Sequence, residues 1–130
     1  MITETDARAW IDAYGRAWVM RDPEQVVQLF TADATYLERP LRSPLRGAAR
    51  IRGYWERTVQ EQQRDVAFAS DFLAVAGDEA VFHWTAHFTW LPISGIMQLD
   101  AMCRVAFAPE NGEDLRQAQA FEEWVDILEG

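Results

Sequence analysis

The fold is decided by the stretch Leu29-Phe30-Thr31-Ala32-Asp33-Ala34-Thr35-Tyr36-Leu37-Glu38-Arg39-Pro40, where a helical pattern gives way to a strand-like one. A short turn separates that pattern from a strand predicted over residues 34–39. One acidic residue, Glu38, lies in this strand, and Pro40 ends it. If the strand alternates regularly, Tyr36 and Glu38 point to the same face.

Two helices are predicted before this stretch. Over residues 6–21 the apolar residues recur at helical spacing on one stripe. Asp22-Pro23 then begins a short second helix, with proline at a first-turn position. The stripe of the first helix consists of Ala7, Trp10, Ile11, Tyr14, Ala17 and Trp18. If Tyr14 is buried, its hydroxyl needs a partner. It is either a donor in a pocket or a core tyrosine bonded to a backbone carbonyl.

The residues after Pro40 predict a loop, a third helix and four long antiparallel strands. Residues 40–46 contain two prolines and read as the loop, and the third helix runs from Gly47 to about Gln62. Helices gathered on one face of a curved antiparallel sheet make an α+β fold. The strands are predicted from Val66, over 80–90, over 96–107 and over 115–127, with turns at Gly77-Asp78 and Asn111-Gly112.

The alternation over residues 80–90 predicts which side of the sheet is interior. Phe82, Trp84, Ala86, Phe88 and Trp90 share the inner face, and His83, Thr85, His87 and Thr89 share the outer one. On a strand, His83 and His87 lie about 13 Å apart. That is too far for one metal ion with bonds of about 2 Å. Both histidines are therefore predicted at the surface or in a dimer interface.

Composition favours one globular domain over residues 1–130, with 49% apolar residues. No apolar run approaches the ~20 residues of a membrane helix. The first residues do not resemble a signal peptide, so a cytoplasmic location is expected. A single cysteine, Cys103, excludes an intramolecular disulfide.

The net charge of −9 is unevenly distributed, and every basic residue is arginine. Residues 58–130 hold three arginines against thirteen acidic residues. That acidic half argues against a nucleic-acid partner, whose phosphates need a basic face. The arginines cluster instead at Arg39, Arg42, Arg46, Arg50, Arg52 and Arg57. This cluster is a solvated face or, alternatively, a surface for an anionic substrate.

The predicted order of elements resembles the nuclear-transport-factor-2-like superfamily, which includes SnoaL-like cyclases and ketosteroid isomerases. The resemblance rests on Leu29-Phe30-(x)2-Asp33-Ala34-Thr35, on Gly47 at a helix start and on Ile51-(x)2-Tyr54-Trp55. It implies the cystatin-like fold, a cone-shaped, bent antiparallel sheet packed on the N-terminal helices. It also implies a cavity between sheet and helices, and homodimers through the sheet.

The first half of the chain is closest in spacing to the ketosteroid isomerases. Their first-helix tyrosine matches Tyr14, and their base aspartate matches Glu38. The protonated aspartate of their third long strand matches Cys103, whose thiol is only a weak donor. The resemblance thus implies that Glu38 moves a proton and Tyr14 polarises an oxygen. The departure at Cys103 argues against steroid isomerisation itself.

A glutamate that faces an apolar cavity loses hydration, which raises its pKa and suits it to acid–base work near neutral pH. The alternative for Glu38 is a solvated pair with Arg39 or Arg42. One of Glu122 and Glu123 must point inward, and matching the isomerase strand selects Glu122; a solvated strand end is the alternative. The expected pocket residues are Trp10, Trp18, Tyr36, Trp55, Trp84, Phe88, Cys103 and Glu122.

The sequence therefore predicts a protein that holds a small apolar organic molecule and acts on it, without cofactor or metal, as an isomerase, cyclase, dehydratase or hydrolase. The alternatives are a non-catalytic ligand-binding or dimerisation module and a protein-interaction domain. An open cavity with Tyr14 and Glu38 favours the enzyme, and an interior filled by tryptophans favours the other two. In a homodimer, histidines meeting at a two-fold axis would weaken association as the pH falls through about 6.5.

Overall fold

The computed structural model describes residues 1–39 and 43–129. The end of the first strand at Pro40 and the pairing of Glu38 with Arg42 lie outside these residues. The helices are α1 (Glu4–Val19), α2 (Pro23–Val27) and α3 (Ala48–Trp55), which continues directly into a π-helical turn, Glu56–Gln60. The strands are β1 (Phe30–Arg39), β2 (Leu45–Arg46), β3 (Gln63–Ala76), β4 (Glu79–Trp90), β5 (Gly95–Phe107) and β6 (Ala118–Glu129).

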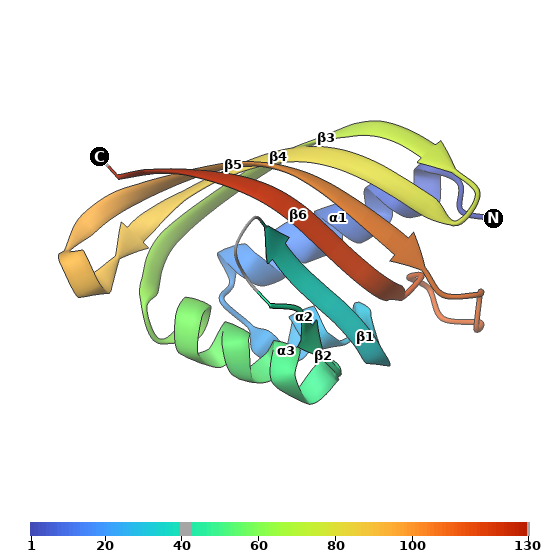
Figure 1. Ribbon diagram of the computed structural model, residues 1–130, viewed down its shortest axis with the longest axis horizontal. Helices are drawn as coiled ribbons and strands as arrows, with labels where there is room; N and C mark the ends of the chain where they lie inside the picture. Colours follow the sequence, from blue (N-terminus) through green and yellow to red (C-terminus); the bar gives the residue numbers. More distant parts are fainter. Residues whose placement is uncertain (40–42, 130) are drawn as a thin grey trace.

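The six strands form one sheet in the order β2-β1-β6-β5-β4-β3. The four long strands are antiparallel neighbours, as predicted. The first strand differs from the prediction, because β1 runs parallel to β6 and the sheet is therefore mixed. The long strands arch over the helices, and the sheet stays open (Figure 1). The predicted α+β fold, a bent sheet packed on N-terminal helices, is confirmed.

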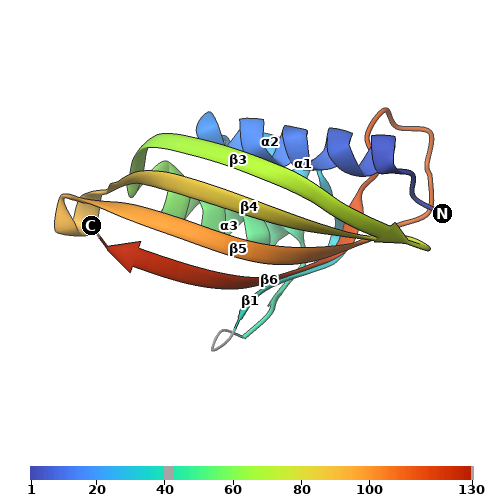
Figure 2. The same ribbon diagram turned by 90° about the horizontal axis from the view of Figure 1, so that it is seen from above.

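The helices lie on the concave side of the sheet, and α1 runs beside β3 (Figure 2). A capping box formed by Thr3 and Asp6 begins α1. At Gly15 the helix comes so close to the strand that an added Cβ would lie 2.4 Å from Cδ1 of Phe68. None of the helices in residues 1–39 and 43–129 is long and apolar enough to cross a membrane.

Aromatic rings fill most of the space between sheet and helices. Phe82, Trp84, Ala86 and Phe88 are buried, which confirms the predicted inner face of β4. From α1, Trp10 stacks on Tyr14 with ring centroids 5.4 Å apart. The interior is thus a packed core rather than an empty cone.

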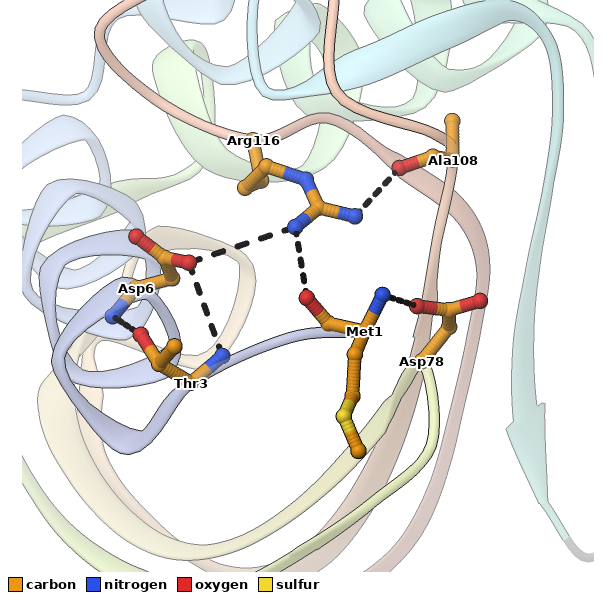
Figure 3. A network of polar contacts seen from close by, with 6 residues as sticks. All are labelled: Met1, Thr3, Asp6, Asp78, Ala108 and Arg116. Carbon is orange, nitrogen blue, oxygen red and sulfur yellow. Dashed lines mark hydrogen bonds and ion pairs between the residues drawn. The ribbon is translucent and has the colours of Figure 1, made fainter.

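A network of polar contacts lies at the end of the molecule where the β3–β4 turn is found (Figure 3). The buried side chain of Arg116 donates to the carbonyl oxygens of Met1 and Ala108 and lies 3.9 Å from Asp6. The amino group of Met1 pairs with Asp78 at 2.7 Å. Because a buried guanidinium needs such partners, this network fixes the β5–β6 loop to the start of α1.

Candidate functional site

Three polar side chains form a row across the concave face of the sheet. Glu38 on β1 is level with Glu123 on β6, and Glu123 is level with Cys103 on β5. Side chains that are paired in register point to the same face and lie next to each other. Glu123 is only 2% exposed and Cys103 is buried, whereas Glu38 keeps part of its surface accessible.

The environment of Glu123 favours its protonated form. Burial is the largest cause that raises its pKa well above the ordinary value, and the negative charge of Glu38 is the second. A hydrogen bond with Glu38 adds to the rise, because only a protonated Glu123 can donate to the other carboxylate. The Trp84 indole lowers the pKa of Glu123 to a smaller degree. Glu123 is therefore the proton-holding member of the pair, and Glu38 is the candidate base.

Two polar atoms beside this pair are left without a hydrogen bond. Oε2 of Glu123 and Nε1 of Trp84 are buried, and neither has a partner of good geometry in the described part of the chain. A buried acceptor without a donor costs free energy. An ionised Glu123 carboxyl would therefore weaken the core in which it is placed.

Glu38 reaches the surface through a cleft of about 370 Å³. The hydroxyl of Tyr54, on α3, donates to Oε2 of Glu38 at 3.0 Å. The residues that line the cleft come from α3, its π-helical turn and the strands. Several of them lie near the end of the sheet where β4 passes into β5, and Figure 1 shows where that turn is. Its polar wall also includes Arg39, Thr58 and Gln63, and its apolar wall consists of Phe88, Trp90, Met97, Leu99, Val125 and Ile127.

Tyr14 lies behind this cleft and not in its wall. Its hydroxyl is 3.2 Å from the hydroxyl of Tyr36, and both side chains are buried. Burial is the first cause that raises the pKa of both tyrosines, and the charge of Glu123 contributes to each. Tyr14 and Glu38 therefore belong to one buried polar region, but each is bonded to a different tyrosine. A direct contact between Tyr14 and a ligand stays a prediction.

Of the aromatic residues expected to line the pocket, only Phe88 lies in the wall of the cleft. The others pack against one another, as Trp18 does with Trp84 at 5.1 Å and with Trp55 at 5.7 Å between ring centroids. This mutual packing leaves no room for a ligand among them. The residues buried away from the cleft are Trp10, Trp18, Tyr36, Trp55, Trp84 and Cys103.

Glu122 faces the outer side of the sheet, which corrects its expected place in the pocket. It accepts from Arg39 at 2.6 Å and from Arg104 at 2.7 Å. Because neighbouring residues on a strand alternate, its outward position places Glu123 inside. The same contact supplies Arg39 with a partner other than Glu38.

The residues that were not predicted for the site include Glu123, Tyr54 and Gln63, together with most of the cleft wall. Tyr54 belongs to the motif of the third helix, and its aromatic ring beside Trp55 was a signal for the interior. Gln63 lies among polar residues between a helix and a strand, and nothing in that pattern indicates that it belongs to a site. In residues 1–39 and 43–129, no group of three or more His, Cys, Asp and Glu side chains is arranged to hold a metal ion.

The raised pKa of Glu123 predicts how stability depends on pH. A carboxyl that holds its proton more tightly when folded stabilises the fold fully below its ordinary pKa of 4.5, and this contribution is lost as the pH rises through the raised value. Above that ordinary value the free energy of unfolding should fall by up to about 1.4 kcal/mol per pH unit because of this group. Urea unfolding across the neutral range should show that Glu123→Gln removes this slope, and equal slopes would contradict it.

Comparison with known proteins agrees with this fold, although no curated protein matches the sequence. The epoxide hydrolase/cyclase-like enzyme SalBIII, described for pyran ring formation in polyether salinomycin, is 20% identical over all of both chains, with a TM-score of 0.80. A putative scytalone dehydratase from Novosphingobium aromaticivorans is 13% identical over 97% of this chain and 86% of its own, with a TM-score of 0.80.

A third structure is a protein with a ketosteroid isomerase-like fold from Catenulispora acidiphila, in complex with trimethylamine. It is 18% identical over 88% of this chain and 82% of its own, with a TM-score of 0.72. At these identities the three structures show a shared fold. The profile of one protein family, the SnoaL-like domain, matches residues 7–126, and the chain therefore belongs to the SnoaL-like domain family.

Proposed function

We propose that this protein holds a small, largely apolar organic molecule in the cleft beside Glu38 and moves a proton to or from it without a cofactor. The observation that carries this proposal is the pair formed by Glu38 and Glu123. One carboxyl lies in the wall of an apolar cleft, and the other lies directly behind it in the core.

The cost of burying Glu123 supports a functional role for the pair. An apolar side chain at this position would avoid the desolvation of a buried carboxyl. Carboxyl groups whose pKa is shifted by burial and by a charged neighbour are concentrated at functional sites. A protonated Glu123 can donate a hydrogen bond to Glu38, which holds the Glu38 carboxyl in place at the cleft wall, where it can accept a proton from a bound molecule.

Tyr14 enters this proposal as a group behind the carboxyl pair. Its raised pKa keeps the hydroxyl protonated, and the bond to Tyr36 fixes its direction. The class of reaction is isomerisation, cyclisation, dehydration or addition of water. Among the proteins of this fold, one is named as an epoxide hydrolase/cyclase-like enzyme and another as a putative dehydratase. One domain over 1–130 and a cytoplasmic location stay predictions.

A non-catalytic ligand-binding module is the second candidate, and the packed interior favours it. The tryptophans fill the cone and leave the cleft at its mouth. Such a module would bind the same apolar molecule but would leave its protons in place. Binding and proton exchange therefore separate the two candidates.

The test is deuterium exchange into the cyclic ketone 2-decalone in D₂O, followed by nuclear magnetic resonance, with binding measured in parallel. Ile127→Trp narrows the cleft, and Leu128→Trp makes the same change at its exposed neighbour outside the cleft wall. The proposal is supported if the native protein and Leu128→Trp exchange deuterium faster than the buffer alone, and if Ile127→Trp does not. Binding without exchange selects the module, and no binding overturns both candidates.

We further propose a homodimer through the outer face of the sheet. Met102 and Trp124 are level with each other on β5 and β6, and both are exposed. On β4, His83 is level with Met102, so polar and apolar groups share this face. Sedimentation at micromolar concentration should show a dimer, and a monomer would overturn the proposal.

The surroundings of His83 reverse the pH dependence predicted from the sequence. Its ring lies 2.7 Å from Asp100 and 3.3 Å from Asp71, and these hydrogen bonds raise its pKa. As the pH falls through that raised value, the positive charge forms between carboxylates, with Asp126 level with Asp100 on β6. The face becomes less negative, so association should hold or tighten between about pH 8.5 and pH 6. Weaker association in acid, or the same response in His83→Gln, would contradict this.

A further inference from the structure

Gln63 combines two features that the proton-transfer site does not use. It is only 3% exposed, and yet it lies in the wall of the cleft. Nε1 of Trp18 donates to Oε1 of Gln63 at 2.7 Å in the core behind the cleft. An indole N–H can only donate, so the amide atom that faces Trp18 must be the oxygen. The bond therefore fixes which way round the amide lies.

Because Trp18 binds the amide oxygen of Gln63, the amide nitrogen with its two N–H donors points away from Trp18. In the described structure this nitrogen has no hydrogen bond to any residue. It is also absent from the set of buried, unpartnered atoms, which are Nε1 of Trp55, Nε1 of Trp84, Nε of Arg116 and Oε2 of Glu123. The donors of Gln63 are therefore reachable, and the space that reaches them is the cleft.

We propose that the Gln63 amide donates a hydrogen bond to an oxygen atom of the bound molecule and so determines specificity in the cleft. The molecule would then be an apolar skeleton that carries an acceptor oxygen, as in a ketone, an ether or an epoxide. This inference rests on the proposed function, since it needs the cleft to hold an organic ligand. A hydrocarbon ligand carries no acceptor for the N–H groups of Gln63. Because a donor that the ligand leaves unpaired costs free energy, such a ligand binds more weakly.

Trp18 acts in this proposal through Gln63. Without its N–H, the amide could turn over and present its oxygen to the cleft, which would reject an acceptor. Trp18→Phe keeps an aromatic ring in the core, removes that N–H and leaves a smaller ring. The expected effect is a smaller preference for the oxygen-bearing ligand, with the affinity for a hydrocarbon unchanged.

The experiment compares two probes of matched shape, 2-acetylnaphthalene and 2-isopropenylnaphthalene, which differ in the carbonyl oxygen. Affinities come from quenching of tryptophan fluorescence or from calorimetry. The native protein should prefer the ketone by about 10–100-fold. Gln63→Glu keeps an acceptor for Trp18 but replaces the donors with an oxygen, so this preference should disappear or reverse. Gln60→Glu, at an exposed position nearby, adds the same charge and should keep the native preference.

A second variant guards against misfolding and charge effects. Gln63→Met removes the donors without adding charge and should bind both probes about equally, with a native circular dichroism spectrum. Equal affinities for the two probes in the native protein overturn the inference, while the exchange test of Glu38 chemistry stands unaffected. A ketone preference that survives in both Gln63 variants also overturns it. Failure of both probes to bind overturns the inference together with the ligand-binding cleft.

Discussion

Replacing Glu38 with glutamine should lower turnover of the native substrate class by about 10²–10⁴-fold, the usual contribution of a positioned acid–base group. Glutamine keeps the size of the side chain and an oxygen that can accept from Tyr54. It cannot take up a proton. The variant should therefore bind ligands in the cleft with nearly native affinity, and the loss should appear in kcat rather than in KM.

The matched control for this variant is Glu122→Gln, one position before Glu123 on the same strand. Glu122 pairs with Arg39 and Arg104 on the outer side of the sheet and does not line the cleft. Its substitution changes the same chemical group outside the cleft wall and should leave kcat nearly unchanged. Unchanged turnover in Glu38→Gln would remove Glu38 from the mechanism.

Trp84→Ala is expected to destabilise the fold by about 3–5 kcal/mol, the range for removing a large aromatic side chain from a core. Trp84 is 1% exposed and contacts the rings of Trp18 and Phe68. Its unpartnered Nε1 slightly offsets this value, because removing the ring also removes a buried donor. Urea unfolding with a fluorescence or circular dichroism readout measures the loss.

The comparison for this prediction is Trp124→Ala, which removes the same side chain from the other side of the sheet. Trp124 is 46% exposed, so its loss should cost less than about 1 kcal/mol in the monomer. A loss below about 1 kcal/mol for Trp84→Ala would mean that its ring contributes little to the packing of the core.

Much of this architecture could be predicted because the inner and outer faces of the long strands differ strongly in composition. On β4, aromatic residues alternate with histidine and threonine, and that pattern alone assigns the faces. On β6 the pattern is less clear, because Trp124 looks like a core residue and Glu123 does not. The shared parity of Phe121, Glu123 and Val125 was the better signal, since residues two apart on a strand point to the same face whichever side chain occupies the site.

The parallel pairing of β1 with β6 and the position of the cleft could not be predicted from local patterns. Strand direction depends on contacts between the two halves of the chain, which residue spacing does not reveal. The position of the cleft depends on which aromatic rings pack against one another in the core and which line the opening beside Glu38. For the same reason Gln63 carried no signal, because its importance comes from Trp18 on a distant helix.

The pairing of β1 with β6 has a consequence for how each new copy of this protein matures. The bond between Arg39 and Glu122 joins positions 83 residues apart, and the neighbouring pair Glu38 and Glu123 is slightly more distant along the chain. During synthesis β1 leaves the ribosome long before its main partner exists. Non-local pairings of this kind form late and slowly. The pair of Glu38 and Glu123 therefore cannot form in a nascent chain until the β6 segment has docked on β1.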